Sequence, residues 1–202
     1  KQLKDLGVEA KAYQCDVANF DDAQALVANI KKDFGSHVSV LVNNAGITKD
    51  GTLKKMTVEQ WQDVINTNLN SVFNLSKAVV DDMVAAGHGR IINISSINGQ
   101  KGQFGQTNYS AAKAGMHGFT MALAQEVAKK GVTVNTISPG YIATEMVMAV
   151  PEEIRNQIIA QIPVNRLGKP EEIGGLVTYL ASDGAGFITG SNIAINGGQH
   201  MK

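Results

Sequence analysis

Tyr109 and Lys113 are the residues whose types and spacing most directly suggest chemistry. They lie four residues apart in a helix-forming stretch, so both side chains project from one helix face, one turn apart. A tyrosine phenol has a pKa of about 10 and is a poor acid at neutral pH, but a neighbouring ammonium group is expected to lower that pKa. Such a phenol can protonate a carbonyl oxygen while a hydride reaches the carbonyl carbon.

The Tyr-x-x-x-Lys spacing alone is weak evidence, because chance yields about 0.3 such pairs in a chain of this composition. Two further residues add context. Ser96 ends an apolar strand, and its hydroxyl could hold the carbonyl oxygen beside Tyr109. Asn68 lies inside a helical stretch, where an asparagine either occupies an exposed face or serves a site. In the second case we expect Asn68 to hold a water behind Lys113 that passes protons to the tyrosine.

The elements that position these residues follow from the alternation of apolar and helix-forming stretches. Thr57 and Gln60 have capping-box spacing, and Pro170 followed by two glutamates is typical of a helix start. The sequence predicts strands over 8–17, 38–42, 89–95, 132–137 and 192–196, and helices over 21–34, 58–86, 108–130, 152–161 and 170–182. Strands alternating with helices indicate a single α/β domain over 1–202, with a doubly wound parallel sheet and helices on both faces.

Ligands of such sheets bind beyond the carboxyl ends of the strands. Polar or glycine-containing breaks follow four of the predicted strands, at 16–17, 43–46, 95–96 and 138–142. Each break could be an ordinary turn, because Asn, Gly, Pro and Ser dominate turns. Their common place at the ligand-binding edge favours a site.

The composition excludes several classes of function. The 18 basic and 18 acidic residues cancel, and no basic stripe indicates a nucleic-acid surface. No apolar run has the length of a membrane span. The single cysteine, Cys15, cannot form an internal disulfide and fits a reducing, cytoplasmic compartment. The four histidines lack metal-ligand spacing, so we assign no metal site.

The order and spacing of these motifs resemble the short-chain dehydrogenase/reductase family over the whole chain. The matching stretches are Asn43-Asn-Ala-Gly46, Asn68, Ser96, Tyr109-Ser-Ala-Ala-Lys113, Ser138-Pro-Gly140 and Asn196-Gly-Gly198. The resemblance implies a Rossmann-like fold and a catalytic tetrad of Asn68, Ser96, Tyr109 and Lys113.

The resemblance also implies a nicotinamide cofactor and the residues that contact it. Asp16 and Val17 would contact the adenine, and Lys113 would hydrogen-bond the nicotinamide ribose. The other implied cofactor contacts are Asn44, Ala45, Gly46, Tyr109, Pro139, Gly140, Ile142 and Thr144.

Within this family the stretch Ser95-Ser-Ile-Asn-Gly-Gln-Lys-Gly-Gln-Phe-Gly-Gln-Thr-Asn-Tyr109 is most similar to the acetoacetyl-CoA reductases. These enzymes make (R)-3-hydroxybutyryl-CoA for polyhydroxybutyrate synthesis, with NADPH as the expected cofactor. Phe104 and Tyr141 could wall a short acyl chain, and glutamines could bind the thioester and its amide arm. The implied substrate contacts are Ser96, Gln103, Phe104, Gln106, Tyr109 and Tyr141. A plain surface loop is the alternative interpretation of residues 103–106.

Two other functions stay open. A 3-oxoacyl-(acyl-carrier-protein) reductase would perform the same chemistry on a protein-borne substrate, and a basic patch near the cleft would favour it. Lys101 and Arg166 do not form a convincing cluster in the sequence. A non-catalytic scaffold of the same fold is the third hypothesis, and the intact tetrad argues against it.

The resemblance also raises an expectation about the start of the chain. Residues 1–7 are typical of the end of a helix, with Gly7 as its stop. The family's glycine-rich phosphate turn does not occur in the sequence, so we expect an N-terminally incomplete domain that lacks roughly 45 residues, most of one βαβ half. Without the central strands that this half supplies, two strand edges would be exposed.

The two long predicted helices, 58–86 and 108–130, carry apolar residues on more than one face. Such helices form subunit interfaces in the family, which implies a homotetramer. Packing of the second apolar face within one chain is the alternative.

Overall fold

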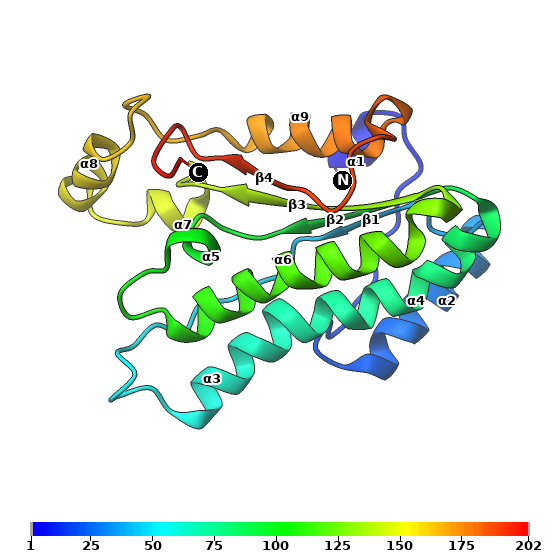
Figure 1. Cartoon of the computed structure of the whole chain (residues 1–202), viewed down its shortest axis with the longest axis horizontal. Coiled ribbons are helices and arrows are strands. Elements are labelled where there is room, and N and C mark those ends of the chain that lie inside the picture. Colours follow the sequence, from blue (N-terminus) through cyan, green and yellow to red (C-terminus); the bar gives the residue numbers. More distant parts are fainter. Residues whose placement is uncertain (1, 202) are drawn as a thin grey trace.

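The computed structural model describes residues 2–201 and shows one parallel sheet between two layers of helices (Figure 1). The strands follow the order β1-β2-β3-β4, and all neighbours pair in parallel. Their bounds are Val40–Asn43 for β1, Gly89–Ile94 for β2, Val132–Pro139 for β3 and Asn192–Ile195 for β4. This arrangement confirms the predicted α/β class with helices on both faces.

The main helices begin and end close to their predicted limits. The long ones are α2 (Phe20–Phe34), α3 (Val58–Ile65), α4 (Ser71–Ala86), α6 (Thr107–Val127), α8 (Glu152–Ala160) and α9 (Pro170–Ala181). Short helices are α1 (Gln2–Asp5), α5 (Asn98–Lys101), α7 (Glu145–Met148), the π-helix η1 (Asn66–Asn70), and the 3-10 helices η2 (Ala128–Lys130) and η3 (Asp183–Ala185). The capping box of Thr57 and Gln60 is present at the start of α3.

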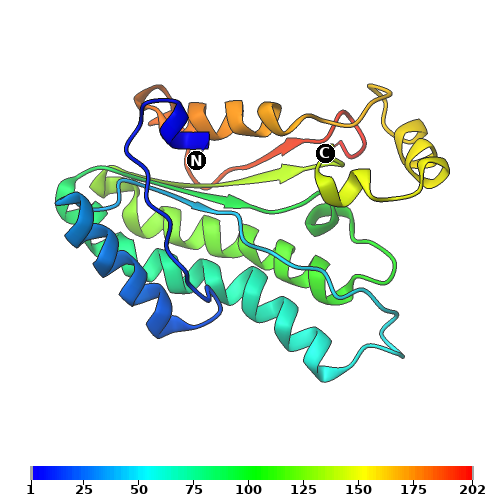
Figure 2. The ribbon, with the colours of Figure 1, turned by 180° about the vertical axis from the view of Figure 1, so that it is seen from behind.

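Two apolar clusters hold the layers together. On one face α4 and α6 pack against the sheet and α2 packs outside α4, whereas α9 covers the opposite face (Figures 1 and 2). In β2 the neighbouring residues Ile91 and Ile92 point to opposite faces, and each joins a different cluster. Both side chains are at most 1% exposed, and burial of such a side chain contributes about 1.5–3 kcal/mol. The central strands are therefore buried on both faces, as parallel sheets require.

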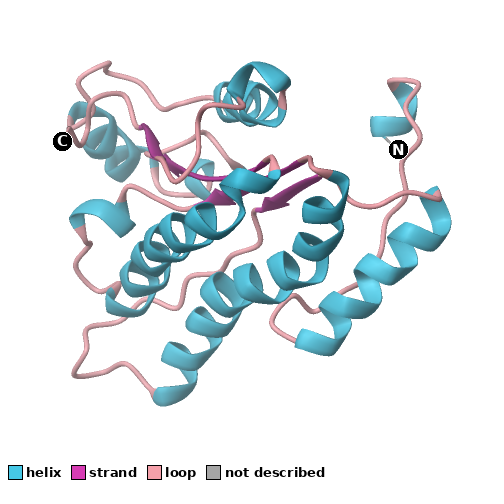
Figure 3. Cartoon of the chain, turned by 45° about the vertical axis from the view of Figure 1, so that its right-hand side comes forward, coloured by secondary structure: helices cyan, strands magenta, loops and turns pink. Residues whose placement is uncertain are grey.

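The segment 8–17 departs from the prediction of a strand. It runs without regular structure and is mostly exposed, away from the sheet and close to α2 (Figure 3). A strand is stabilised by hydrogen bonds to a neighbouring strand, and within residues 2–201 only β2 pairs with β1, which leaves β1 as an edge strand. Strand-like composition alone therefore did not produce a strand here.

The sequence interpretation also missed two short helices. Asn98–Lys101 and Glu145–Met148 lie in stretches that were expected to be loops. At the start of the chain, α1 ends before Gly7, whose φ of +76° fits the expected helix stop, while Lys1 lies outside the described residues. None of the helices within residues 2–201 combines the length and the apolar character that a membrane span requires.

Candidate active site

The carboxyl ends of β2 and β3 form the base of the site. Beyond the end of β2, the backbone N–H of Ser95 donates to the Ile137 carbonyl at 2.7 Å, and that of Ile97 donates to the Pro139 carbonyl at 2.8 Å. The backbone on both sides of Ser96 is thus tied to β3. Ser96 is placed by the sheet rather than by a free loop.

Hydrogen bonding also orients the Ser96 hydroxyl. Its Oγ accepts the backbone N–H of Asn98 at 3.1 Å, at the start of α5. A hydroxyl has one hydrogen and two acceptor lone pairs, so its own hydrogen can be donated to the phenol oxygen of Tyr109 or to a ligand oxygen beside it. Ser96 and Tyr109 line the same cavity, where that hydrogen can reach a ligand oxygen.

Lys113 lies behind the cavity, on the sheet-facing side of α6. Its side chain is 3% exposed, and its Nζ donates to the Ile94 carbonyl at 2.7 Å. The same nitrogen is 5.6 Å from the centre of the Tyr109 ring. Burial lowers the pKa of the Lys113 ammonium to about 8. The group can therefore hold or release a proton close to neutral pH.

The structure corrects the expected pKa of Tyr109. Burial raises this pKa, a hydrogen bond with the Ser96 hydroxyl opposes the rise, and the charge of Asp50 adds to it. The expected lowering by Lys113 is not found. The ammonium is itself desolvated and donates to the carbonyl of Ile94, and its nitrogen lies 5.6 Å from the centre of the tyrosine ring. In the described chain Tyr109 is therefore a protonated donor at neutral pH.

Asn68 is fully buried in η1, which excludes the exposed-face interpretation. Its Oδ1 accepts the Ile47 N–H at 2.8 Å, and its Nδ2 donates to the Ile47 carbonyl at 2.9 Å. A Cβ added at Gly46 would lie 3.3 Å from Asn68 Oδ1 and 3.5 Å from Lys113 Nζ. The loop after β1 thus approaches both residues closely. Short π-helical segments such as η1 are frequent at functional sites.

A cavity of about 270 Å³ opens at this edge of the sheet. It brings together eight of the predicted site residues: Ser96, Gln106, Tyr109, Pro139, Gly140, Tyr141, Ile142 and Thr144. Five residues that were not predicted complete the lining: Thr48, Ser95, Ile97, Asn98 and Val147. Asn68 and Lys113 do not line it and lie behind it.

The predicted substrate contacts fall into two groups. Gln106 belongs to a fixed network, because its Oε1 accepts from Asn98 Nδ2 at 3.0 Å and its Nε2 donates to Asp50 at 2.9 Å. Gln103 and Phe104 lie outside the cavity lining. Gln103 accepts a hydrogen bond from Lys101, and Phe104 is 87% exposed.

The predicted adenine contacts lie in the turn before α2. Asp16 Oδ1 accepts the Ala18 N–H at 3.0 Å, and Asn74 of α4 donates to the Val17 carbonyl at 3.0 Å. The turn is therefore fixed to α4 rather than to a strand. In the loop after β1, Asn44, Ala45 and Gly46 are exposed.

The residues present fit the nicotinamide half of a dinucleotide. Gly46 leaves open surface above Asn68 and Lys113, because a Cβ at this position would crowd Asn68 Oδ1 at 3.3 Å and touch Lys113 Nζ at 3.5 Å. The cavity beside it offers the hydroxyls of Ser96 and Tyr109 as donors. A flat ring with an adjoining ribose could occupy this space.

Asn108 is a site residue that the sequence interpretation missed. It is fully buried, and its Nδ2 donates to the carbonyls of Lys49 and Gln60 at 3.0 and 3.1 Å. Its Oδ1 accepts the backbone N–H of Tyr109 at 2.8 Å. Asparagines at helix starts commonly satisfy backbone groups, which is the signal that could have identified it.

The comparisons with known proteins agree with this geometry. A family model described as "Enoyl-(Acyl carrier protein) reductase" matches residues 1–200. The acetoacetyl-CoA reductase of Cupriavidus necator is 56% identical over 201 residues, which cover 100% of this chain and 81% of the relative. The acetoacetyl-CoA reductase of Shinella zoogloeoides is 60% identical over 188 residues, 93% of this chain and 78% of the relative.

A third relative is named for a different substrate. The 3-oxoacyl-(acyl-carrier-protein) reductase of Pseudomonas aeruginosa is 48% identical over 200 residues, which cover 99% of this chain and 81% of the relative. All of these matches extend over nearly the whole chain and include the sheet edge described above. The chain belongs to the short-chain dehydrogenase/reductase family of nicotinamide-dependent oxidoreductases.

Proposed function

We propose that this protein reduces acetoacetyl-CoA to (R)-3-hydroxybutyryl-CoA with NADPH. The observation that carries the proposal is the convergence of Ser96 and Tyr109 on one cavity, with Lys113 buried behind them. The relatives named acetoacetyl-CoA reductase, at 56% and 60% identity, support the choice of substrate. We place the reaction in the cytoplasm, as a step toward polyhydroxybutyrate.

The chain's own residues supply the proton and the orientation of the carbonyl. Ser96 holds the 3-carbonyl oxygen by donating the hydrogen that its Asn98 contact leaves available. Tyr109 protonates the same oxygen as negative charge develops on it. Lys113, with its pKa lowered to about 8, replaces the lost proton, and Asn68 positions the relay water. When bound, the reduced nicotinamide supplies the hydride to the carbonyl carbon.

The cofactor would lie along the sheet edge from the turn before α2 to the cavity. Asp16 and Val17 would hold the adenine, and Asn44, Ala45 and Gly46 would lie under the ribose and nicotinamide. Pro139, Gly140, Ile142 and Thr144 would border the nicotinamide from the β3 side, where all four line the cavity. Tyr109 and Lys113 would bind the nicotinamide ribose.

A CoA thioester is favoured over a carrier-protein thioester. Docking of an acidic carrier would require free basic side chains near the cavity, but Arg166 forms two hydrogen bonds to Glu172 at 2.7 and 2.8 Å. These bonds lower the pKa of Glu172 to about 2. Lys101 donates to Gln103 Oε1. The two basic residues considered for such a patch therefore already have partners.

The proposal is tested by following oxidation of the reduced nicotinamide by absorbance. Acetoacetyl-CoA is supplied with NADPH and then with NADH, and acetoacetyl-carrier-protein serves as the competing substrate. We expect rapid turnover with NADPH and the CoA ester, and much slower turnover with the other combinations. Activity confined to the carrier-bound ester would instead assign the protein to fatty-acid synthesis. Absence of turnover with both esters would favour the scaffold hypothesis.

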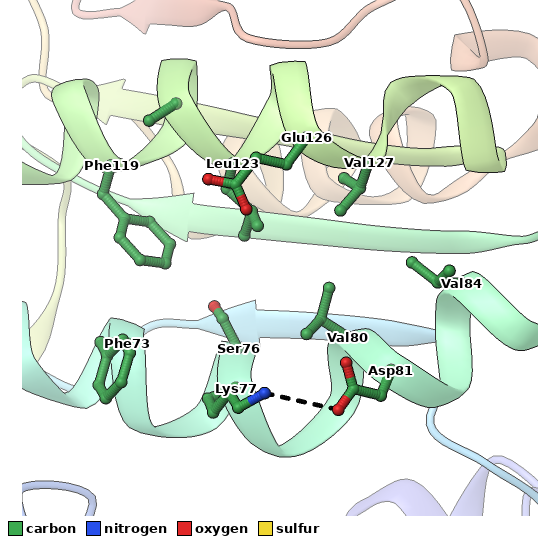
Figure 4. A pocket seen from close by; sticks show the side chains of 11 residues that line it. Phe73, Ser76, Lys77, Val80, Asp81, Val84, Phe119, Leu123, Glu126 and Val127 are labelled. Carbon is green, nitrogen blue, oxygen red and sulfur yellow. Dashed lines mark hydrogen bonds and ion pairs between the residues drawn. The ribbon is translucent and has the colours of Figure 1, made fainter.

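We further propose that the protein forms a homotetramer, with one interface on the groove between α4 and α6. This groove of about 420 Å³ has apolar walls that include Phe73, Val80 and Leu123 (Figure 4). Its rim carries both signs of charge, with a Lys77–Asp81 ion pair at 3.5 Å. A two-fold interface places the same patch on itself, so a mixed rim is compatible with a second copy.

Light scattering on Phe73→Glu tests the interface. Phe73 is 51% exposed, so the substitution should leave the folded chain intact and reduce the assembly to a smaller species. Val58→Glu introduces the same charge at an exposed position at the start of α3 and should leave the assembly unchanged. An unchanged mass of Phe73→Glu would contradict the proposed interface.

A further inference from the structure

The residues directly before Ser96 and Pro139 both contact one histidine. His117 Nε2 lies 2.9 Å from Ser95 Oγ just beyond the end of β2 and 3.4 Å from Ser138 Oγ near the end of β3. Ser95 is 4% exposed and Ser138 is fully buried. One imidazole nitrogen of α6 therefore lies between the ends of the two strands that form the base of the site.

The other partners of these serines determine the direction of the hydrogen bonds. Ser95 Oγ lies 2.9 Å from the Lys113 carbonyl, which can only accept. Ser138 Oγ donates to Asn192 Oδ1 at 2.6 Å. A hydroxyl has one hydrogen, so each serine can only accept from the histidine. All of these contacts are satisfied together only when His117 carries a hydrogen on Nε2.

The position of His117 on α6 explains why one such contact matters. Lys113, His117 and Thr120 form a polar stripe at helical spacing that faces the sheet. Lys113 donates to Ile94, and Thr120 contacts Asn93 and Thr136 at 2.9 and 2.7 Å. Backbone hydrogen bonds join the strands to one another, but apolar packing is non-directional and does not fix where α6 lies along them. The hydrogen bonds made by this polar stripe fix that position.

We infer that His117, protonated at Nε2, is a positioning residue that holds the ends of β2 and β3 against α6. It acts through Ser95 and Ser138, and so keeps Ser96 and the Pro139–Gly140 turn in place relative to Tyr109 and Lys113. The catalytic part of this inference rests on the proposed reduction, whereas the protonation of Nε2 does not.

Nitrogen-15 NMR of the histidine-labelled protein tests the contact independently of activity. We expect the His117 Nε2 signal at pH 8 to be that of a nitrogen that carries a hydrogen, with slow exchange of that hydrogen. A His117→Gln sample identifies the signal by its loss. An Nε2 without a hydrogen would overturn the inference, whatever substrate the protein reduces.

Steady-state kinetics test the positioning role. His117→Leu removes the donor, and we expect a loss of about ten- to a hundredfold in kcat from the misplaced serine and tyrosine, with KM changed less than kcat. His117→Gln keeps an N–H donor on a side chain of similar length and should recover most of the lost kcat. His88→Leu replaces a histidine between α4 and β2, at the opposite end of the sheet, and should leave kcat unchanged.

The outcomes remain distinct even if one variant fails to fold. Wild-type kcat in folded His117→Leu overturns the positioning role, as does a His117→Gln kcat as low as that of His117→Leu. If His117→Leu does not fold, the NMR signal of the wild-type protein and the kcat of His117→Gln decide. A wild-type protein without activity on either thioester refutes the proposed function but leaves the NMR test valid.

Discussion

The two parts of the candidate site differ in how firmly the protein holds them. At the strand ends, the backbone on both sides of Ser96 is tied to β3, and Lys113 is buried. In the loop between α5 and α6, Gln103 and Phe104 lie outside the cavity lining, and Phe104 is 87% exposed. The proton-transfer groups are therefore preorganised, whereas part of the proposed acyl-CoA surface is not assembled.

This difference has a physical reason. Proton transfer requires fixed geometry within a hydrogen-bond length, and fixed dipoles avoid reorganisation during the reaction. A thioester arm can be bound by residues that become ordered only on binding, and this ordering lowers the affinity. We therefore expect substitutions at the strand ends to change kcat or stability, and those in the loop to change KM.

Removing the proton donor should have the largest effect. Tyr109→Phe keeps the buried ring and deletes the hydroxyl, so we expect kcat to fall by about 10² to 10⁴-fold with the fold retained. Kinetics and circular dichroism measure the two quantities. Tyr179→Phe makes the same change on a 49% exposed tyrosine of α9 and should leave kcat unaltered. Near-wild-type turnover of Tyr109→Phe would refute the assignment of the acid.

Because Lys113 is buried, we expect the free energy of unfolding to depend on pH. Its pKa is about 8 in the folded protein and 10.5 in the unfolded reference, so between these values the unfolded chain binds the additional proton. The free energy of unfolding therefore rises with pH across this window, by up to about 3 kcal/mol from this group, and is lower by that amount below pH 8.

Urea unfolding of the wild type and Lys113→Met at several pH values isolates this contribution. The wild type should gain stability relative to Lys113→Met as the pH rises from 8 to 10.5. Lys129→Met, in the exposed η2 turn, should retain the wild-type rise. A constant difference between wild type and Lys113→Met would mean that the lysine is not desolvated as described.

Asn108→Ala tests whether an anchor of Tyr109 matters to the chemistry. The substitution leaves the carbonyls of Lys49 and Gln60 without this donor, and we expect a loss of about 1–3 kcal/mol in unfolding free energy. A fall in kcat should accompany it, because the first turn of α6 is released. Asn135→Ala also removes a buried amide with two backbone partners, Ile188 and Ser191. It should lose stability without losing kcat, and equal kcat losses would argue against a specific role of Asn108.

Phe104→Ala should have the smallest effect and should change only the KM for the substrate. We expect stability within about 0.5 kcal/mol of wild type, because the side chain is almost fully exposed. The KM for acetoacetyl-CoA should rise by no more than about tenfold, which corresponds to about 1.4 kcal/mol, since a ring this exposed can bury only part of its surface on the substrate. Phe187→Ala, on another fully exposed ring, should change neither quantity. A drop in kcat with unchanged KM would instead place Phe104 in the preorganised part.

Much of the framework could be predicted from residue order. The helix starts at Thr57 and Pro170 followed from local capping chemistry, and the order of strands and helices followed from apolar periodicity. The Tyr109–Lys113 pair followed from helical spacing. These features depend on neighbours within a few residues, so the sequence contains the information directly.

Other features depend on contacts between distant segments. The segment 8–17 has the composition of a strand but lacks a paired strand among the described residues, because pairing depends on what lies beside it. The expected lowering of the Tyr109 pKa reversed because burial and the orientation of Lys113 are tertiary properties. Neither composition nor spacing could reveal these outcomes.

The sequence by itself determined the fold class, the helix that presents Tyr109 and Lys113, and the strand ends that carry Ser96 and Pro139. Only the tertiary structure decided that Asn108 and His117 bind backbone and side-chain groups next to the site, and that Gln103 and Phe104 remain outside it. Local propensity is encoded by nearby residues, whereas burial and hydrogen-bond partners come from residues tens of positions away that the fold brings into contact.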